Sequence, residues 1–245
     1  MTPQETSNCN ESAMASFAAA RGSGARSKFK TIVADPPWPY EGAIKGSLAH
    51  RPNRDKTAGS RMGVSSVERY GCMSIEELCA MPVKESAADD AHLYLWTTNS
   101  FMVEAHTIAR AWGFEPKTIV TWVKTRVEDG KPSMKMGYYY RGATEHVLFC
   151  VRGSLPLQGE AHATAFLTPR PQRGHSAKPD YFYAMVEKQS LAPRLEIFAR
   201  PQDALWPKRD GWETWGNELP NDVELVLPNA PDEPRRTGDV NREAD

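Results

Sequence analysis

Hydrophobic and polar positions along the chain form two alternating kinds of segment. Nearly continuous apolar runs, typical of strands buried on both faces, occupy Phe29–Ala34, His92–Thr97, Thr118–Val123, His146–Val151 and Arg194–Ala199. Between several of these runs the apolar residues recur with the period of an α-helix. Strands that alternate with helices predict an α/β fold with a doubly wound, mostly parallel sheet and helices on both of its faces.

Capping residues and prolines mark the expected helix ends. The capping box at 74–77 (Ser-Ile-Glu-Glu) predicts a short helix that Pro82 terminates. Asn99 is expected to cap a second helix, which ends before Gly113. A third helix is expected from Pro179 to Lys188. The stretch from 41 to 69 has no apolar period, so we expect a long loop there.

The two ends of the chain differ in composition from its middle. Residues 1–28 are rich in Ser, Ala, Gly and Asn, which predicts a flexible leader. Residues 220–245 contain four Pro, seven acidic residues and only three Arg. This composition predicts a disordered acidic tail. The expected folded domain is therefore 29–219.

Composition narrows the class of protein. With 245 residues, of which 40% are hydrophobic and 25% charged, the chain is expected to be globular. Its net charge of -1 excludes a uniformly basic surface but not a local basic groove. The four Cys include no CxxC pair, so we expect reduced thiols and no metal site. No signal peptide or membrane span is visible, which predicts a soluble cytoplasmic protein without membrane contact. Seven Trp and nineteen Pro are unusual, and several of them are adjacent.

The candidate chemistry lies in Asp35-Pro36-Pro37-Trp38, directly after the first strand. An exocyclic amine on an aromatic base is a poor nucleophile because its lone pair is delocalised into the ring. A carboxylate and a backbone carbonyl that both accept hydrogen bonds from the amine localise the lone pair and aim it at an electrophilic methyl group. Two prolines would present the Pro36 carbonyl with no competing N–H nearby. Trp38 is suited to stack on a base that has left its strand.

This peptide resembles the signature of the MT-A seventy-kilodalton-like family, the adenine-N6 methyltransferases related to the messenger-RNA adenosine methyltransferase, in its bacterial or phage type. Further segments resemble the family in the family's order and extend the likeness over about 29–219. These are Tyr70 with Met73–Leu78, Leu93–Trp96, Ala111–Phe114, Trp122–Thr125, Glu145-His146, Arg152-Gly153, His175–Asp180, Arg194–Pro201 and Trp215–Glu218.

The resemblance implies a Rossmann-like methyltransferase fold with permuted motif order and S-adenosylmethionine as cofactor. It implies that Asp35 contacts both the target amine and the cofactor's amino group. The expected cofactor-binding residues are Asp35, His175, Lys178, Glu196, Phe198, Arg200, Asn217 and Glu218. The chain departs from the family where Thr144 and Gln202 replace a lysine and a histidine that face the cofactor. We therefore expect Lys178 or His175 to bind the cofactor carboxylate.

The implied substrate is adenine in nucleic acid. Basic and aromatic residues near the signature would neutralise phosphates and stack on bases, and the candidates are Tyr40, Arg54, Lys56, Lys124, Tyr140 and Arg141. DNA is favoured and RNA is the alternative. A non-catalytic nucleic-acid-binding subunit of the same fold is a second alternative, which the intact signature opposes. A cytosine-N4 methyltransferase ranks lower because it typically has Ser at the position of Asp35. The partners left open are a second copy of this chain or a different subunit.

Overall fold

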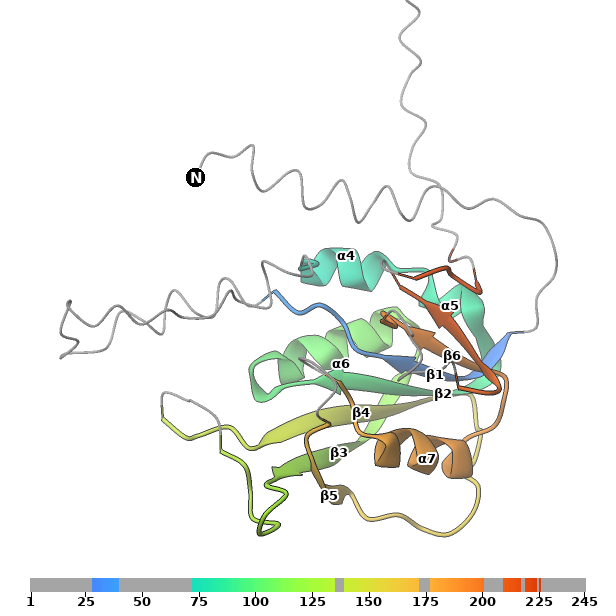
Figure 1. The fold of residues 1–245 in the computed structure, drawn as a ribbon. Helices are drawn as coiled ribbons and strands as arrows, with labels where there is room; N and C mark the ends of the chain where they lie inside the picture. The colour runs from blue at the N-terminus through green and yellow to red at the C-terminus, as the bar shows by residue number, and fades with distance from the viewer. Residues whose placement is uncertain are drawn as a thin grey trace, which may run out of the picture.

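The computed structural model describes residues 28–39, 72–134, 139–171, 177–200, 209–216, 219–223 and 225, and these form an α/β domain (Figure 1). The strands are β1 (Phe29–Ala34), β2 (Ala87–Thr97), β3 (Glu115–Thr125), β4 (Thr144–Arg152), β5 (Ala165–Pro169), β6 (Arg194–Ile197) and β7 (Trp212–Trp215). The helices are α4 (Ile75–Ala80), α5 (Val83–Ser86), α6 (Met102–Ala111) and α7 (Asp180–Gln189).

The strands form one seven-stranded sheet in the order β5-β3-β4-β2-β1-β6-β7. Neighbouring strands are parallel except where β4 pairs with β2 and with β3, because β4 alone runs in the opposite direction. The helices α4 and α6 lie on one side of the sheet and α7 lies on the other (Figure 1). The predicted doubly wound, mostly parallel sheet is therefore confirmed.

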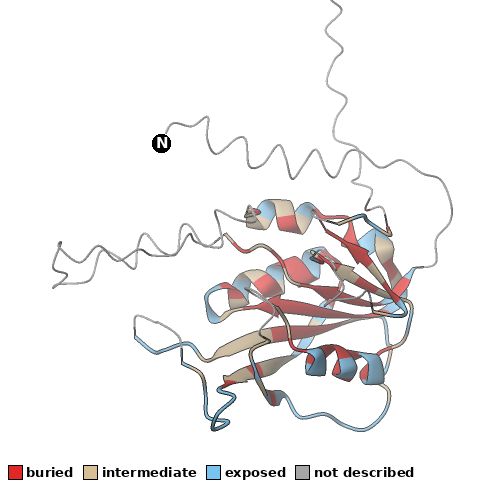
Figure 2. Ribbon diagram, viewed as in Figure 1, coloured by how far each residue is buried: buried red, intermediate tan, exposed pale blue. Residues whose placement is uncertain are grey.

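Each face of the sheet has its own hydrophobic core. In β1, Ile32 and Ala34 pack with α4 and α6, whereas Val33 points to the opposite face and packs with α7. This follows from the alternation of side chains along a strand. The central strands are buried on both faces (Figure 2), which explains why their sequences are nearly continuous apolar runs.

The predicted strands are all present, with some changes in length. β1 has the predicted bounds, whereas β2, β3 and β4 are longer than their apolar cores. β6 is shorter than predicted because Phe198 has a φ of 65°, which is incompatible with a strand. The short edge strands β5 and β7 were not predicted, since neither forms a run of apolar residues.

The helices confirm part of the capping analysis. Ser74 and Glu77 form the predicted capping box of α4, which ends at Ala80, before Pro82. The prediction that Asn99 caps α6 is wrong. Residues 99–101 form a 3₁₀ turn, and the N-cap of α6 is Phe101, which offers no polar side chain.

The disordered tail was predicted to begin at 220, which is too early for the described residues 220–223 and 225. Val223 and Leu225 are buried in the core beside α4 and α6. The carboxylate of Asp222 accepts hydrogen bonds from the backbone N–H and the hydroxyl of Thr214, each at 2.8 Å. The packed part of the chain therefore includes residues beyond 220. Among the helices described, none is both long enough and apolar enough to span a bilayer.

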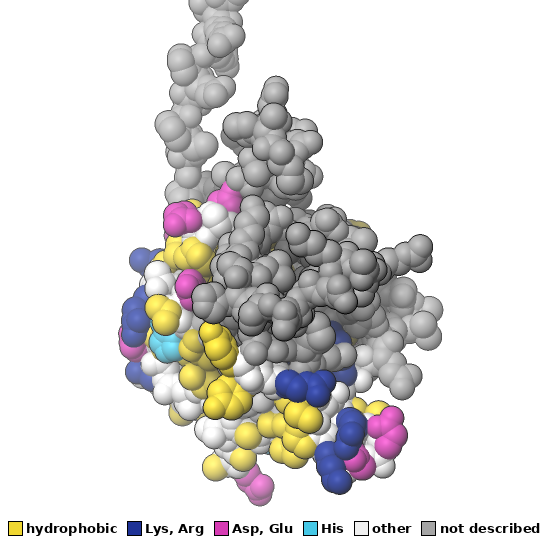
Figure 3. All heavy atoms as spheres, turned by 90° about the vertical axis from the view of Figure 1, so that its left-hand side faces the viewer, with side chains coloured by type: hydrophobic (Ala, Val, Ile, Leu, Met, Phe, Trp, Pro, Cys, Tyr) yellow, Lys and Arg dark blue, Asp and Glu magenta, His cyan; other side chains and the backbone are white. Residues whose placement is uncertain are grey.

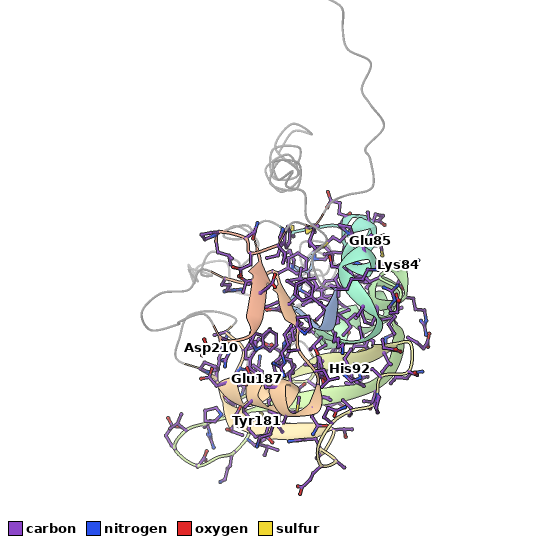
Figure 4. The ribbon with its side chains drawn as sticks, turned by 90° about the vertical axis from the view of Figure 1, so that its right-hand side faces the viewer. Lys84, Glu85, His92, Tyr181, Glu187 and Asp210 are labelled. Carbon is purple, nitrogen blue, oxygen red and sulfur yellow. The ribbon has the colours of Figure 1, made fainter. Side chains whose placement is uncertain are left out.

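A buried polar network joins β2 to the C-terminus of α7. His92 is fully buried near the sheet edge that Figure 4 faces, and its Nδ1 lies 2.8 Å from the Ser190 hydroxyl. Its Nε2 lies 2.9 Å from the carbonyl oxygen of Leu155. The Tyr94 hydroxyl also lies 2.8 Å from that of Ser190. These bonds satisfy polar groups that would otherwise destabilise the core.

Stability should decrease in mild acid because of His92. Burial lowers its pKa below the ordinary 6.5, although the Leu155 carbonyl partly offsets this shift. Below pH 6.5 the unfolded chain binds a proton that the folded chain excludes, so the free energy of unfolding falls by about 1.4 kcal/mol for each unit of pKa shift. Urea unfolding at about pH 7.5 and about pH 5.5 measures this loss.

In the same measurement, His92→Gln should be less stable than the wild type at the higher pH but should lose less stability in acid. His162→Gln changes an exposed histidine and should keep the wild-type dependence. Equal acid sensitivity of His92→Gln and wild type would refute the assignment.

Candidate functional site

Charged side chains from four parts of the chain meet at one edge of the sheet. Asp35 directly follows β1, Lys124 is at the end of β3, Glu145 is at the start of β4 and Lys178 lies two residues before α7. The antiparallel direction of β4 brings its first residues to the edge where the parallel strands end. Lys124 and Glu145 lie two residues from Trp122 and Val147, which pack with α7, so strand alternation places them on the same face.

These four side chains form a continuous row of alternating charge. Nζ of Lys178 lies 3.0 Å from Oδ1 of Asp35 and 2.9 Å from Oε2 of Glu145. Oε1 of Glu145 forms an ion pair with Lys124. The Lys178 ammonium also lies 4.6 Å from the centre of the Trp96 ring, within the range of a cation–π interaction. The row therefore runs Asp35, Lys178, Glu145, Lys124.

The pairing keeps charges ionised in a poorly hydrated place. Burial raises the pKa of Asp35, and the ammonium of Lys178 opposes that shift. For Glu145, burial alone would raise the pKa, but Lys178 and Lys124 together lower it to about 2. The side chain of Asp35 keeps 27% of its surface exposed, against 16% for Glu145. Asp35 is thus the carboxylate of the row that a substrate can reach.

The signature peptide makes a tight turn that differs from its predicted form. The backbone N–H of Trp38 donates to the carbonyl of Pro36 at 2.9 Å, so the expectation of no competing donor is wrong. The donor lies two residues further along the chain, and Trp38 is the only residue of Pro36-Pro37-Trp38 that has a backbone N–H. The carbonyl of Pro37 accepts from the N–H of Met73 at 3.1 Å. A carbonyl oxygen has two lone pairs, so Pro36 keeps acceptor capacity.

Trp38 lies in the core and not on an open surface. Its side chain is 4% exposed, its Nε1 donates to the Trp96 carbonyl at 3.3 Å, and its ring stacks on Phe101 with centroids 5.1 Å apart. The structure therefore contradicts the expectation that Trp38 is a platform for a base. Its contacts instead anchor the turn that carries Asp35 to the end of β2.

A second polar group lies beside Asp35 at the end of β6. The Tyr183 hydroxyl of α7 donates to Oε1 of Glu196, which shares the α7 face of the sheet with Val33. Burial raises the pKa of Glu196, and the hydrogen bond from Tyr183 opposes this. The Arg209 guanidinium lies 4.1 Å from the centre of the Tyr183 ring. Tyr183 was not predicted as a site residue, since in the sequence it is one of several aromatic residues on a helix.

Phe198 and Gly216 form a close junction just beyond β6 and β7. The Phe198 ring packs edge-on against Trp215, with centroids 5.8 Å apart. A Cβ at Gly216 would lie 2.1 Å from the carbonyl oxygen of Ala199, so only glycine allows the two segments to come this close. Arg200, which follows, is exposed.

Some of the remaining predicted site residues lie within the described part of the chain, and the others lie outside it. Tyr140 and Arg141 are exposed in the connection between β3 and β4, at the same edge as Asp35, whereas Lys124 is held in the ion pair with Glu145. Figure 3 faces this edge and shows Lys and Arg side chains next to hydrophobic ones on its visible part. The residues that lie outside the described part of the chain are Tyr40, Arg54, Lys56, His175, Gln202, Asn217 and Glu218.

Glu145 is the main residue whose role the sequence did not reveal. Glu145 lies next to His146 in a segment that resembles the family. In a parallel sheet, however, the first residues of a strand lie at the edge opposite the ligand-binding site. The hydroxyl of the neighbouring Thr144 lies 3.3 Å from Nε2 of His146 instead of contacting the charged row. The reversed direction of β4 is the information that places Glu145 in the site.

The donor set fits S-adenosylmethionine, which carries a sulfonium and an ammonium group, a carboxylate and an adenine ring. Asp35 and Glu196 offer carboxylates for the cationic and hydroxyl groups, and Lys178 offers a buried ammonium for the carboxylate. Phe198, half-buried beside Trp215, offers an aromatic edge. The described residues contain no group of three or more His, Cys, Asp or Glu side chains arranged to hold a metal ion.

The doubly wound sheet, with its charged site at the strand ends, has the architecture of a Rossmann-like methyltransferase. The model of the MT-A70 family matches residues 29–218, and the chain belongs to this family of methyltransferases.

Similar proteins include both bacterial and animal members. Type II methyltransferase M.MunI from Mycoplasma sp is 30% identical over 207 residues, covering 82% of each chain. The N(6)-adenosine-methyltransferase MT-A70-like protein of Drosophila melanogaster is 27% identical over 82% of this chain and 28% of its own. The human N(6)-adenosine-methyltransferase catalytic subunit METTL3 is 26% identical over 82% of this chain and 30% of its own. The chain thus spans less than a third of these two animal relatives.

Gly216→Ala should destabilise the domain. The new methyl group would overlap the Ala199 carbonyl and force β6 and β7 apart, at a cost of about 1–3 kcal/mol in the free energy of unfolding. Urea unfolding measures the loss. Gly142→Ala is the matched control, because a Cβ at Gly142 meets nothing within 4 Å. Equal stability of Gly216→Ala and wild type would show that the junction tolerates a side chain.

Proposed function

We propose that this protein transfers a methyl group from S-adenosylmethionine to the N6 amine of adenine in nucleic acid, with DNA as the favoured polymer. The observation that carries the proposal is the partly accessible carboxylate of Asp35, fixed at the end of a central strand and paired with the buried ammonium of Lys178. Family membership supplies the reaction class.

Asp35 is the residue that acts on the amine. Its carboxylate accepts a hydrogen bond from one amine hydrogen, while the free lone pair of the Pro36 carbonyl is suited to accept the other. These bonds draw the nitrogen lone pair out of conjugation with the ring and direct it at the methyl carbon. As the new C–N bond formed, the methyl C–S bond of the cofactor would break and leave its electron pair on sulfur, and the amine would release one proton. The partly exposed Asp35 carboxylate is suited to receive that proton.

The cofactor supplies an activated methyl group on a sulfonium. Among the described residues we assign Lys178 to its carboxylate, Glu196 to a hydroxyl or amino group and Phe198 and Arg200 to the adenosine part. We extend the assignment to Asn217, Glu218 and His175 from the family resemblance alone. Lys178 would then bind the cofactor and also keep Asp35 ionised.

DNA is favoured over RNA by the extent of the similarity. The chain aligns with most of the type II methyltransferase, but with less than a third of the animal proteins whose name specifies adenosine, a ribonucleoside. RNA as the substrate of the same reaction is the second candidate. A non-catalytic subunit is disfavoured because Asp35 is present and ion-paired in the site.

The reaction and the polymer can be tested together. The purified protein is incubated with S-adenosylmethionine labelled in its methyl group and with separate DNA and RNA pools, and the nucleosides are then analysed. We expect labelled N6-methyl-2′-deoxyadenosine. Label only in RNA would reject DNA as the substrate, and label on a cytosine amine would reject the target atom.

Asp35→Ala should abolish methyl transfer in that assay, since the amine would lose its charged acceptor. The domain should stay folded, because Asp35 lies outside the two hydrophobic cores. Most of the cofactor affinity should also remain, as a calorimetric titration would show. Asp210→Ala, on an exposed turn at the opposite edge in Figure 4, is the control and should keep full activity. Methylation by Asp35→Ala would disprove the mechanism.

Basic residues of the segments 41–61 and 117–152 should contribute to binding of the nucleic acid through phosphate contacts. We expect neutralising Arg54, Lys56, Lys131 and Lys135 together to weaken binding and to reduce the slope of log affinity against log salt by about 3–4. Lys84→Gln with Lys188→Gln changes exposed lysines outside the site and should leave the slope intact. An unchanged slope in the fourfold variant would remove these residues from the binding surface.

A further inference from the structure

Lys124 occupies a place that a phosphate-binding lysine would not. The sequence suggested that it contacts the substrate, yet its side chain is only 12% exposed and its ammonium is paired with Glu145. The neighbouring Lys178 is also nearly buried, with 8% of its side chain exposed. Burial of a lysine is costly unless its charge is paired, so the Lys124–Glu145 pair requires an explanation.

The two oxygens of Glu145 are divided between two lysines. Oε1 pairs with Lys124, and Oε2 accepts from Lys178 at 2.9 Å. A carboxylate bound on both sides cannot rotate without breaking one of these pairs. Lys124 therefore fixes the orientation in which Glu145 meets Lys178.

The position of Lys178 in turn depends on a balance between two carboxylates. Its Nζ lies 2.9 Å from Glu145 and 3.0 Å from Asp35, so neither carboxylate dominates by distance. If Glu145 lost Lys124, its unshared charge would attract Lys178 more strongly. Lys178 would then interact less with Asp35. If Glu145 were neutral, Lys178 would interact mainly with Asp35.

We propose that Lys124 is a positioning residue, which holds Glu145 so that Lys178 is shared with Asp35 and the Asp35 carboxylate stays ionised for the reaction. The inference rests on the proposed function for its catalytic meaning. Its electrostatic part concerns this chain alone and can be tested without substrate or cofactor.

Other charged groups also face this row and are kept unchanged in the test. Asp35 is influenced by Arg200, beyond β6, and by Glu196 on β6. Tyr183 of α7 donates to Glu196 and also faces Asp35. Lys124 is influenced by Arg170, just beyond β5. Substitutions at Lys124 and Glu145 therefore change the balance while every other partner of Asp35 remains.

Two single variants should shift the ionisation of Asp35 in opposite directions. Lys124→Met should raise the pKa of Asp35 by about one unit, because Lys178 moves toward Glu145. Glu145→Gln should lower the pKa of Asp35 by a similar amount, because Lys178 loses its competing partner. In the double variant no Glu145 charge is left for Lys124 to hold, so the pKa of Asp35 should stay as low as in Glu145→Gln. Lys124→Arg keeps the charge and should resemble the wild type.

The pKa of Asp35 is measured by NMR on the full chain labelled with ¹³C at the aspartate carboxyl groups, and Asp35→Asn identifies its signal. The acid limb of kcat/KM against pH is then recorded for each active variant and should move in the same direction. Lys188→Met, an exposed lysine of α7, is the control and should leave both measurements unchanged. Circular dichroism checks that each variant is folded.

The outcomes separate this inference from the proposed function. Opposite shifts in the two single variants, with the double variant resembling Glu145→Gln, support the inference even if no methylation is detected. An unshifted Asp35 signal in Lys124→Met, together with a higher KM and a smaller salt slope, would return Lys124 to the substrate surface. If Lys124→Met does not fold, an unshifted signal in Glu145→Gln would overturn the inference in the same way.

Discussion

The buried ammonium of Lys178 is the interaction on which the site depends. It joins the turn after β1, the start of β4 and the segment before α7, three parts of the chain that are distant in sequence. An unpaired ammonium in this position would be strongly destabilising, and so would either carboxylate without it. The Asp35 carboxylate is thus paired by the same contact that ties the sheet edge to α7.

The fold places these groups by ordinary rules of sheet construction. Ends of parallel strands meet at one edge, and alternation of side chains sends Glu196, Asp35, Glu145 and Lys124 to the same face. The residues between them on the sheet are apolar and close-packed, which leaves little freedom for the polar row to move. The Trp38–Phe101 stack serves the same purpose on the other face, since it fixes the turn from which Asp35 projects.

Much of this arrangement could be predicted from the sequence, and what could not has physical reasons. Long apolar runs identified the central strands, and the capping box identified α4, because both signals are local. The short strands β5 and β7 have few apolar residues, and their pairing is set by distant partners. Asp35 was predicted from the chemistry of its motif. Glu145 was missed because its place depends on strand direction, and Trp38 was assigned to the substrate because a motif does not reveal burial.

The reversed strand β4 has a consequence for how such an enzyme can change. Because β4 runs against its neighbours, Glu145 projects from paired strand backbone, not from one of the loops that line the edge. The connection between β3 and β4, with its exposed tyrosines, can then vary in sequence without altering the ionic row behind it. In the function that we propose, recognition of the polymer and chemistry at the amine are therefore assigned to separate parts of the chain. New target sequences could be acquired by replacing loops while the reaction is preserved.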